Sequence, residues 1–329
     1  MKIATIGTGV IVDGFIDACH KVDGVEVIAV YSRQESTGKL LADKSGITKI
    51  YTDINTMLKD VEIDTVYVAS PNSLHFAQTL DILNAGKNAI VEKPFCSTDE
   101  ESEKLIAKAN EKGCYLFEAM SIRFMPNLEL LKQKLSLIGP IKWTELSMCQ
   151  YSSKFNALRA GELPNVFNSE FSGGAFMDLN IYHLNFAIEL FGYPINSQYF
   201  ANLHPNGIDL SGMLYMQYPH MTISAIATKD SVGKPYGVIH GENGMIEFIE
   251  GVNGLRSFTL TQNKEKTVFN IQTIDNRLVY EVQAFESIIK NGNREEMNDL
   301  LDKTQMIMKL MTKIRRDAGL YFTADKKYI

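Results

Sequence analysis

The chain has 329 residues, of which 45% are hydrophobic and 22% charged, enough for two globular domains with ordinary cores. Its formal net charge of −6 excludes a global positive field that would attract nucleic acid or an anionic membrane. No stretch approaches the roughly 18 apolar residues of a membrane span. The cysteines (Cys19, Cys96, Cys114 and Cys149) form no C-x-x-C pair, so we expect reduced thiols, no metal site and a cytoplasmic location.

Strands and helices alternate through the first third of the chain. Short apolar runs predict strands, and amphipathic stretches closed by glycine predict the helices between them. The expected strands are residues 3–6, 25–31, 65–69, 88–91 and 115–118, and the expected helices are residues 10–21, 40–44, 73–84 and 98–112. This alternation is typical of βαβ units, so we expect a doubly wound parallel sheet in a first domain of residues 1–121.

The pattern changes after residue 121. Helices are expected at residues 127–136, 174–191, 278–290 and 295–316, and strands at residues 141–150, 210–218, 222–228, 237–240, 245–249 and 257–261. Turn residues separate the strand runs, which indicates a mainly antiparallel sheet. We therefore expect a second, α+β domain of residues 122–329, whose exposed sheet face favours a homodimer or homotetramer.

A glycine turn, Gly7-Thr8-Gly9, follows the first strand and precedes a helix. The first glycine permits the tight turn, and the second lets the backbone approach a pyrophosphate. The N–H groups at the start of the helix, at Val10 and Ile11, can bind the same group. Val12 replaces the third glycine of the dinucleotide fingerprint, which predicts a slightly displaced helix. The turn in this context predicts a bound dinucleotide.

The end of the second strand reads Tyr31-Ser32-Arg33, where an NAD site would carry Asp or Glu. No carboxylate is there to repel a 2′-phosphate, while a hydroxyl and a guanidinium are there to bind one. This favours NADP over NAD, although NAD remains possible. In the alternative interpretation Arg33 is merely exposed, and Glu35 reaches the ribose from the next turn.

Polar groups also follow two later strands, and the carboxyl ends of parallel strands form the ligand-binding edge of such a sheet. Ser70-Pro71-Asn72 and His75 come after residues 65–69, and we expect them to line the nicotinamide. His75 could equally cap or pack its own helix. Glu92-Lys93-Pro94 closes residues 88–91 and places an ammonium at the same edge, where Lys93 could contact a ribose or tune a neighbouring acid.

In the second domain, Gly173-Gly174 precedes a helix that carries Asp178 and Tyr182 four residues apart. Regular helical spacing puts this carboxylate and this phenol on one face. A tyrosine beside an apolar stripe can also be core packing with its hydroxyl satisfied. His183 is the competing base, but five residues turn it about 140° away from Asp178.

These motifs together resemble the Gfo/Idh/MocA oxidoreductases. The resemblance rests on Gly7-Thr8-Gly9, Glu92-Lys93-Pro94, Glu118-Ala119 with Arg123-Phe124 and Pro126, and Gly173-Gly174-x3-Asp178-x3-Tyr182. It spans essentially the whole chain. It implies an N-terminal Rossmann domain, a C-terminal domain whose open sheet often forms the oligomer interface, and hydride transfer between NAD(P) and sugars, polyols or related alcohols.

Carried over by position, the resemblance implies that Lys93 touches the nicotinamide ribose and the substrate, that Asp178 binds the substrate, and that Tyr182 is the general acid/base. Tyrosine at this position is similar to the glucose–fructose oxidoreductase and dihydrodiol dehydrogenase branch, which commonly uses NADP(H), whereas inositol dehydrogenases have His. Ser121 stands where dimeric dihydrodiol dehydrogenases carry Trp, which favours a sugar or polyol over an aromatic diol.

The expected mechanism is proton transfer coupled to hydride transfer. Tyr182 would take the proton of the substrate hydroxyl as the hydride leaves for nicotinamide C4, and the Lys93 ammonium would favour the phenolate. We expect Lys93 and Tyr182, contributed by different domains, to lie on either side of the substrate. The alternative is a non-catalytic NAD(P)-binding regulator or sensor of the same fold, which would not need both residues.

Overall fold

In the computed structural model, which describes residues 1–327, the chain forms two compact units. The first unit comprises Met1–Met120 and Asn276–Lys309, and the second comprises Ser121–Asp275 and Leu310–Lys327. This division differs from the predicted second domain of residues 122–329, because residues 276–309 pack with the first unit instead. The last two residues of the predicted range lie outside the described residues.

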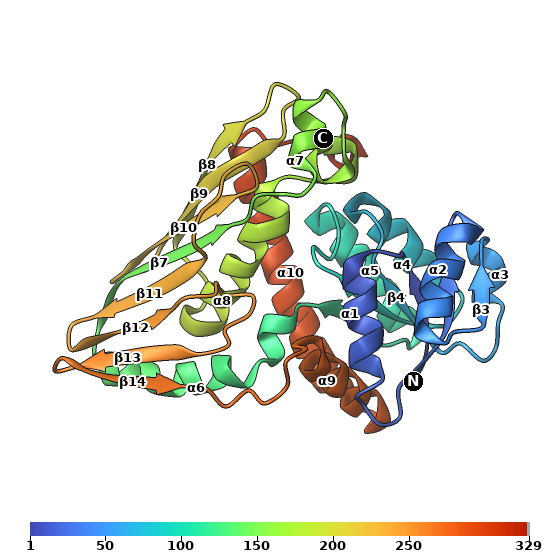
Figure 1. Cartoon of the computed structure of the whole chain (residues 1–329), viewed down its shortest axis with the longest axis horizontal. Coiled ribbons are helices and arrows are strands. Elements are labelled where there is room, and N and C mark those ends of the chain that lie inside the picture. The colour runs from blue at the N-terminus through green and yellow to red at the C-terminus, as the bar shows by residue number, and fades with distance from the viewer. Residues whose placement is uncertain (328–329) are drawn as a thin grey trace. The chain divides into compact units, whose positions relative to one another are not determined.

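The first unit is built on a six-stranded parallel sheet in the order β3-β2-β1-β4-β5-β6 (Figure 1). Its strands are β1 (Lys2–Ile6), β2 (Glu26–Tyr31), β3 (Lys49–Tyr51), β4 (Thr65–Val68), β5 (Asn88–Glu92) and β6 (Leu116–Ala119). Both β4 and β6 are buried at every position, as expected for a parallel sheet covered on both faces. The predicted doubly wound parallel sheet is confirmed. The strand order reverses between β1 and β4, which opens the crevice where such sheets bind ligands.

Helices from both ends of the chain cover this sheet. They are α1 (Val10–Cys19), α2 (Glu35–Ser45), α3 (Ile54–Leu58), α4 (His75–Asn84), α5 (Asp99–Lys112), α9 (Leu278–Lys290) and the first part of α10 (Arg294–Asp317). Among them α4 packs on α5, and α1 packs on α9. Phe285 of α9 stacks on Phe117 of β6 with their ring centroids 4.5 Å apart. The apolar face of α9 is therefore buried against the parallel sheet, which explains why residues 276–309 belong to the first unit.

The second unit contains an eight-stranded sheet in the order β14-β13-β12-β11-β7-β10-β9-β8. Its strands are β7 (Ile141–Cys149), β8 (Asn196–Leu203), β9 (Asp209–Gln217), β10 (Thr222–Thr228), β11 (Tyr236–Gly241), β12 (Gly244–Phe248), β13 (Phe258–Gln262) and β14 (Glu265–Phe269). All neighbouring pairs are antiparallel except β7 and β10, which are parallel. The prediction of a mainly antiparallel sheet is confirmed.

Helices of the second unit lie along one face of this sheet (Figure 1). They are α6 (Pro126–Lys134), α7 (Phe155–Arg159), the π-helical turn η6 (Phe176–Asn180), α8 (Ile181–Phe191) and the end of α10. Side chains that point the other way include Phe200, Met213 and Ile226, which pair across three strands and are 52%, 37% and 41% exposed. The sheet is open on that face, and association into a homodimer or homotetramer through it stays a prediction.

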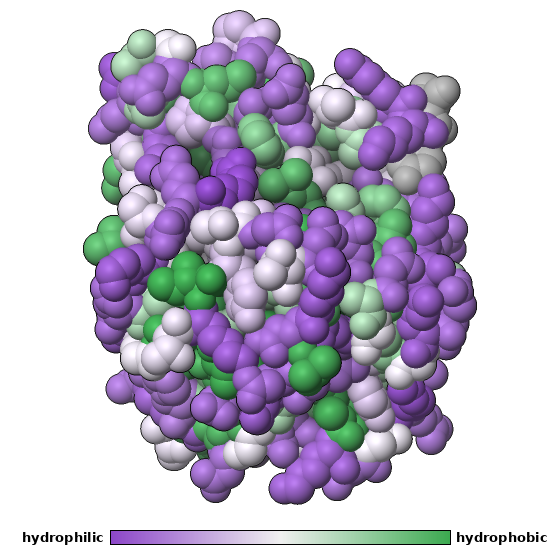
Figure 2. All heavy atoms as spheres, turned by 90° about the vertical axis from the view of Figure 1, so that its right-hand side faces the viewer, coloured by the Kyte–Doolittle hydropathy of each residue, from purple (hydrophilic) through white to green (hydrophobic). Residues whose placement is uncertain are grey.

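The side of the first unit that carries β3, α2 and α3 is mainly hydrophilic, with apolar residues in small separate groups (Figure 2). Within residues 1–327, no helix combines the length and the apolar character needed to cross a membrane. All four cysteines carry free thiols. The cytoplasmic location stays a prediction.

Candidate active site

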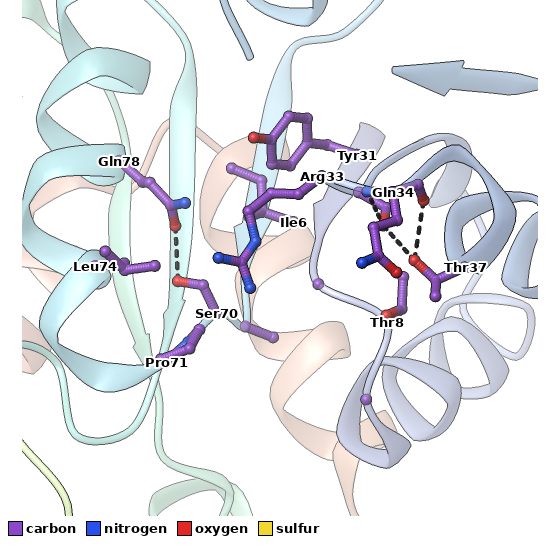
Figure 3. A pocket seen from close by; sticks show the side chains of 14 residues that line it. Ile6, Thr8, Tyr31, Arg33, Gln34, Thr37, Ser70, Pro71, Leu74 and Gln78 are labelled. Carbon is purple, nitrogen blue, oxygen red and sulfur yellow. Dashed lines mark hydrogen bonds between the residues drawn. The ribbon is translucent and has the colours of Figure 1, made fainter. Parts of the chain in front are cut away.

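A cavity of about 800 Å³ opens in the first unit at the crevice between β1 and β4 (Figure 3). The predicted residues that line it are Gly7, Thr8, Gly9, Ser32, Arg33, Ser70 and Pro71. The sequence did not point to its other lining residues, which are Ile6, Tyr31, Gln34, Thr37, Ala69, Leu74 and Gln78. Six predicted cofactor contacts are not among the lining residues, namely Val10, Ile11, Asn72, His75, Glu92 and Lys93. Most of the cavity wall therefore comes from the ends of β1, β2 and β4.

The two glycines of the first turn are required for different reasons. Gly7 has φ +115°, and a Cβ there would lie 2.5 Å from the Ala69 carbonyl oxygen, so the fold itself requires glycine. At Gly9 the backbone is extended, and a Cβ would meet no protein atom within 4 Å. Helix α1 begins directly after Gly9 without a side-chain cap, which leaves its first N–H groups available to a ligand. Packing therefore does not explain the glycine at position 9.

The loop after β2 holds Arg33 at the cavity. The hydroxyls of Ser32 and Thr37 lie 2.6 Å apart, and Thr37 Oγ1 donates to the Gln34 carbonyl at 2.9 Å. The loop is thereby fixed by its own hydroxyls, and the Arg33 side chain extends into the cavity (Figure 3). Arg33 is the one charged residue of the lining, which contains no carboxylate, and Glu35 is not part of it.

Two hydrogen bonds to the buried Glu92 carboxylate hold the Glu92-Lys93-Pro94 segment in place. Tyr67 donates its hydroxyl to Glu92 Oε1 at 2.5 Å, and Glu92 Oε2 accepts from the Lys93 backbone N–H at 3.2 Å. Burial raises the pKa of the Glu92 carboxyl, and the peptide bond between Lys93 and Pro94 is cis. Glu92 thus supports the backbone of Lys93 rather than facing the cavity.

His75 joins two loops at the same edge of the sheet. Its Nδ1 lies 2.9 Å from the Pro94 carbonyl oxygen and its Nε2 lies 2.9 Å from the Ser70 carbonyl oxygen. The side chain is only 1% exposed, and burial lowers its pKa. Ser70 in turn donates its hydroxyl to Gln78 Oε1 at 2.7 Å. Of the two interpretations of His75, this geometry fits the packing one, because both ring nitrogens face protein carbonyls.

The helix that carries Asp178 and Tyr182 is not regular. Residues 176–180 form the π-helical turn η6, and α8 begins at Ile181. Spacing of 3.6 residues per turn therefore does not relate Asp178 to Tyr182 or to His183, and the predicted shared face does not follow from it. Such π-turns occur frequently at functional sites. Asp178 pairs with the ammonium of Lys229, a residue that the sequence gave no reason to select.

Gly173 and Gly174 are explained by packing rather than by the approach of a ligand. A Cβ at Gly173 would lie 2.4 Å from the Val166 carbonyl oxygen, and one at Gly174 would lie 1.9 Å from Asp209 Oδ1. Asp209 is 1% exposed and accepts from the Phe176 backbone N–H at 2.6 Å and from the Tyr199 hydroxyl at 2.7 Å. Gly174 lets this carboxylate cap the start of η6, and Gly173 lets the backbone pass close to Val166.

His183 is buried more deeply than Tyr182, with exposed fractions of 0% and 8%. Its Nδ1 lies 3.1 Å from Asn180 Nδ2, and its Nε2 has no hydrogen-bond partner within the described part of the chain. Burial lowers the pKa of His183 to about 3, so the ring is neutral near pH 7. The burial of His183 disfavours it as the base, whereas the predicted angle between His183 and Asp178 does not, because the π-turn changes that angle.

Asp209→Asn is expected to flatten the pH dependence of stability. Burial raises the pKa of Asp209 to about 6, so between about pH 4 and pH 6 the folded state keeps a proton that the unfolded state has lost. The free energy of unfolding therefore falls as pH rises through that window. Urea denaturation near pH 4.5 and near pH 7 should show the wild type losing about 2 kcal/mol more than the variant, which has no carboxyl there. Parallel curves for the two proteins would contradict the burial of an ionisable Asp209.

The chain is similar to known oxidoreductases over its whole length. A family model described as an oxidoreductase family with an NAD-binding Rossmann fold matches residues 1–120. An uncharacterized oxidoreductase of Escherichia coli, YgjR, is 34% identical over 99% of this chain and 98% of its own. The scyllo-inositol 2-dehydrogenase (NADP(+)) IolU of Bacillus subtilis is 30% identical over 99% of both chains.

A solved structure shows the same fold at lower identity. The 3-ketoreductase KijD10 of Actinomadura kijaniata, in complex with NADP and TDP-benzene, superposes with a TM-score of 0.83 at 19% identity and covers 96% of this chain and 97% of its own. The full-length matches to relatives at 30% and 34% identity confirm the resemblance predicted from the motifs. The chain therefore belongs to the Gfo/Idh/MocA family of oxidoreductases.

Proposed function

We propose that this chain is an NADP(H)-dependent dehydrogenase or reductase that acts on the CH–OH group of a sugar or polyol. The observation that carries the proposal is the cavity at the β1/β4 crevice, whose lining has Arg33 as its one charge and contains no carboxylate. The Arg33 guanidinium can bind the additional phosphate of NADP, and no carboxylate is there to repel the negative charges of the ligand. The full-length relative that uses NADP+ and oxidises an inositol supports the same cofactor and substrate class.

The residues of the cavity fit NADP(H). Gly7 and Gly9 with the start of α1 would hold the pyrophosphate, and Ser32 and Arg33 would hold the 2′-phosphate. Ser70 and Pro71 line the other side of the crevice. When bound, the nicotinamide supplies or accepts the hydride. The protein residues bind and orient the nicotinamide, and they transfer the proton of the substrate hydroxyl.

We assign the role of general acid/base to Tyr182. During oxidation its phenolate oxygen accepts the proton of the substrate hydroxyl, and during reduction the phenol returns the proton to the carbonyl oxygen. Asp178 accepts a hydrogen bond from the substrate and orients it. The Lys93 ammonium contacts the nicotinamide ribose and the substrate. The burial of His183 supports Tyr182 in this role.

A binding and activity screen tests the proposal. Calorimetry with NADPH and with NADH compares the two cofactors, and the absorbance of reduced nicotinamide follows turnover of polyols, sugars and diols, beginning with scyllo-inositol. We expect tighter binding of NADPH and turnover of at least one polyol or sugar. Tight cofactor binding without turnover of any compound would instead support the non-catalytic regulator.

Arg33→Ala is expected to weaken NADPH binding selectively. A charge-assisted contact to the 2′-phosphate is lost, so Kd for NADPH should rise about 10-fold or more, while Kd for NADH should change by less than about threefold. The control is Lys39→Ala, which removes an exposed cation of α2 that pairs with Asp43 and does not line the cavity. Equal weakening of both cofactors by Arg33→Ala would show that Arg33 does not read the 2′-phosphate.

A further inference from the structure

Lys229, the residue directly after β10, is a buried lysine to which the proposed reaction assigns no role. It is 5% exposed. Its backbone is held on both sides, since its N–H donates to the Leu210 carbonyl at 2.8 Å and its carbonyl accepts from the Ser152 N–H at 2.8 Å. An ammonium in such a place is costly unless a carboxylate faces it. Its position is therefore fixed by the sheet, and its charge needs a partner.

Asp178 of the second unit supplies that partner. The Lys229 ammonium donates to Asp178 Oδ2 in η6. It also acts on Asp209, whose pKa its charge lowers against the larger effect of burial. Asp209 holds the first residue of the same π-turn through the Phe176 N–H. Lys229 thus pairs directly with the acid in the middle of η6, and its charge also acts on the acid that binds the start of the turn.

The widened turn explains why Asp178 needs an external support. Within a regular helix, the i−4 and i+4 neighbours restrict where a side chain points, but a π-turn disrupts that register. The Asp178 side chain is 30% exposed, so it reaches solvent at one end while Lys229, with 6% of its side chain exposed, holds it from the buried side. The carboxylate is fixed by a cation that has almost no access to solvent itself.

We propose that Lys229 is a positioning residue, which holds the Asp178 carboxylate oriented toward the substrate hydroxyl. The inference rests on the proposed function, because it assumes that Asp178 binds the substrate. Lys229 acts through Asp178 and does not itself contact the substrate. Removing the ammonium should therefore impair substrate binding, leave cofactor binding intact, and have no further effect once Asp178 is gone.

The test uses Lys229→Met, Asp178→Asn and the double variant in the full chain, assayed with NADP+ and scyllo-inositol or the polyol with the highest kcat/KM in the screen. We expect each single variant to raise KM for the polyol by about 10-fold or more, with a smaller fall in kcat and with Kd for NADPH unchanged within twofold. The double variant should match Asp178→Asn within twofold, as expected of two residues that act as one unit.

Lys132→Met is the matched control. Lys132 on α6 pairs with Glu189 of α8 at 3.0 Å, so the variant removes another lysine–carboxylate contact, made to the helix that follows η6. It should alter the unfolding midpoint and leave KM unchanged. A raised KM in Lys132→Met would show that any lost ion pair on α8 disturbs the site, and would overturn the specific role of Lys229.

The outcomes separate the two claims. Wild-type KM in Lys229→Met, beside a raised KM in Asp178→Asn, overturns the role of Lys229 and leaves that of Asp178 intact. Wild-type kinetics in Asp178→Asn overturn the substrate role of Asp178 in the proposed function. If Lys229→Met does not fold, the double variant, which buries no lone charge from this pair, is compared with Asp178→Asn. A further 10-fold rise in KM in the double variant would show that Lys229 acts independently of Asp178.

Discussion

Tyr182→Phe is expected to lower kcat for polyol oxidation by on the order of 10²-fold or more. The variant keeps the ring and removes only the hydroxyl, so the substrate proton loses its acceptor while the shape of the site is kept. Kd for NADPH should stay within about twofold, because Tyr182 lies in the second unit, whereas the cavity at the β1/β4 crevice is formed by the first. Steady-state kinetics with the best polyol of the screen, together with calorimetry of NADPH, measure both quantities.

Tyr218→Phe is the control for Tyr182→Phe. Tyr218 is also nearly buried, at 5% exposure, and its hydroxyl donates to the Gly192 carbonyl at 3.0 Å just after α8. Loss of that hydrogen bond should cost about 1 kcal/mol of stability and leave kcat unchanged. Turnover at the wild-type rate by Tyr182→Phe would remove Tyr182 from the acid/base role.

The parallel sheet could be predicted because its sequence signals are local. Each strand from β1 to β6 except β3 is a short apolar run, and each main helix follows it within a few residues. Gly7 and Gly9 lie in one turn, so three consecutive residues are enough to predict the position of the ligand-binding crevice. The partner of α9 could not be predicted. Its apolar face shows that it packs on something, but only the contact of Phe285 with Phe117 shows which sheet that is.

Two strands of the second sheet left no readable pattern. The edge strands β8 and β14 are largely accessible, with seven of eight and five of five positions exposed or half-buried. Apolar and polar residues alternate along a strand only when one of its faces is buried. Neither face of β8 or β14 is buried along its length, so their sequences do not alternate in this way. Central strands such as β10, which buries every second residue up to Ala227, carried the signal instead.

The polar groups that hold Asp178 and its π-turn could not be predicted from the sequence either. The pattern around residue 178 is that of an ordinary amphipathic helix, and nothing in it marks a π-turn. The groups that stabilise the turn, Asp209 and Lys229, come from β9 and from the end of β10, 31 and 51 residues along the chain. Sequence spacing identifies residues that share an element, whereas these contacts are made across elements. The glycines before the helix were the one available signal, and a glycine pair does not reveal which group, here Asp209, lies against it.

Gly174→Ala is expected to destabilise the protein by about 3 kcal/mol or more, enough to prevent folding of a marginally stable chain. Gly174 has φ +103°, a conformation that costs an L-residue energy by itself. The added Cβ would also lie 1.9 Å from Asp209 Oδ1, a buried carboxylate that cannot move without releasing Phe176 and Tyr199. Urea denaturation, or the yield of soluble protein if the variant does not fold, measures the loss.

Gly9→Ala is the matched glycine variant and should behave in the opposite way. Its backbone has φ −83°, and the added Cβ meets no protein atom within 4 Å, so the free energy of unfolding should change by less than about 0.5 kcal/mol. The methyl group would, however, stand between the backbone and a pyrophosphate, so Kd for NADPH should rise about 10-fold or more. Stability lost at position 9 and cofactor affinity lost at position 174 in a folded protein would reverse both assignments. Gly9 would then serve the fold, and Gly174 would serve the ligand.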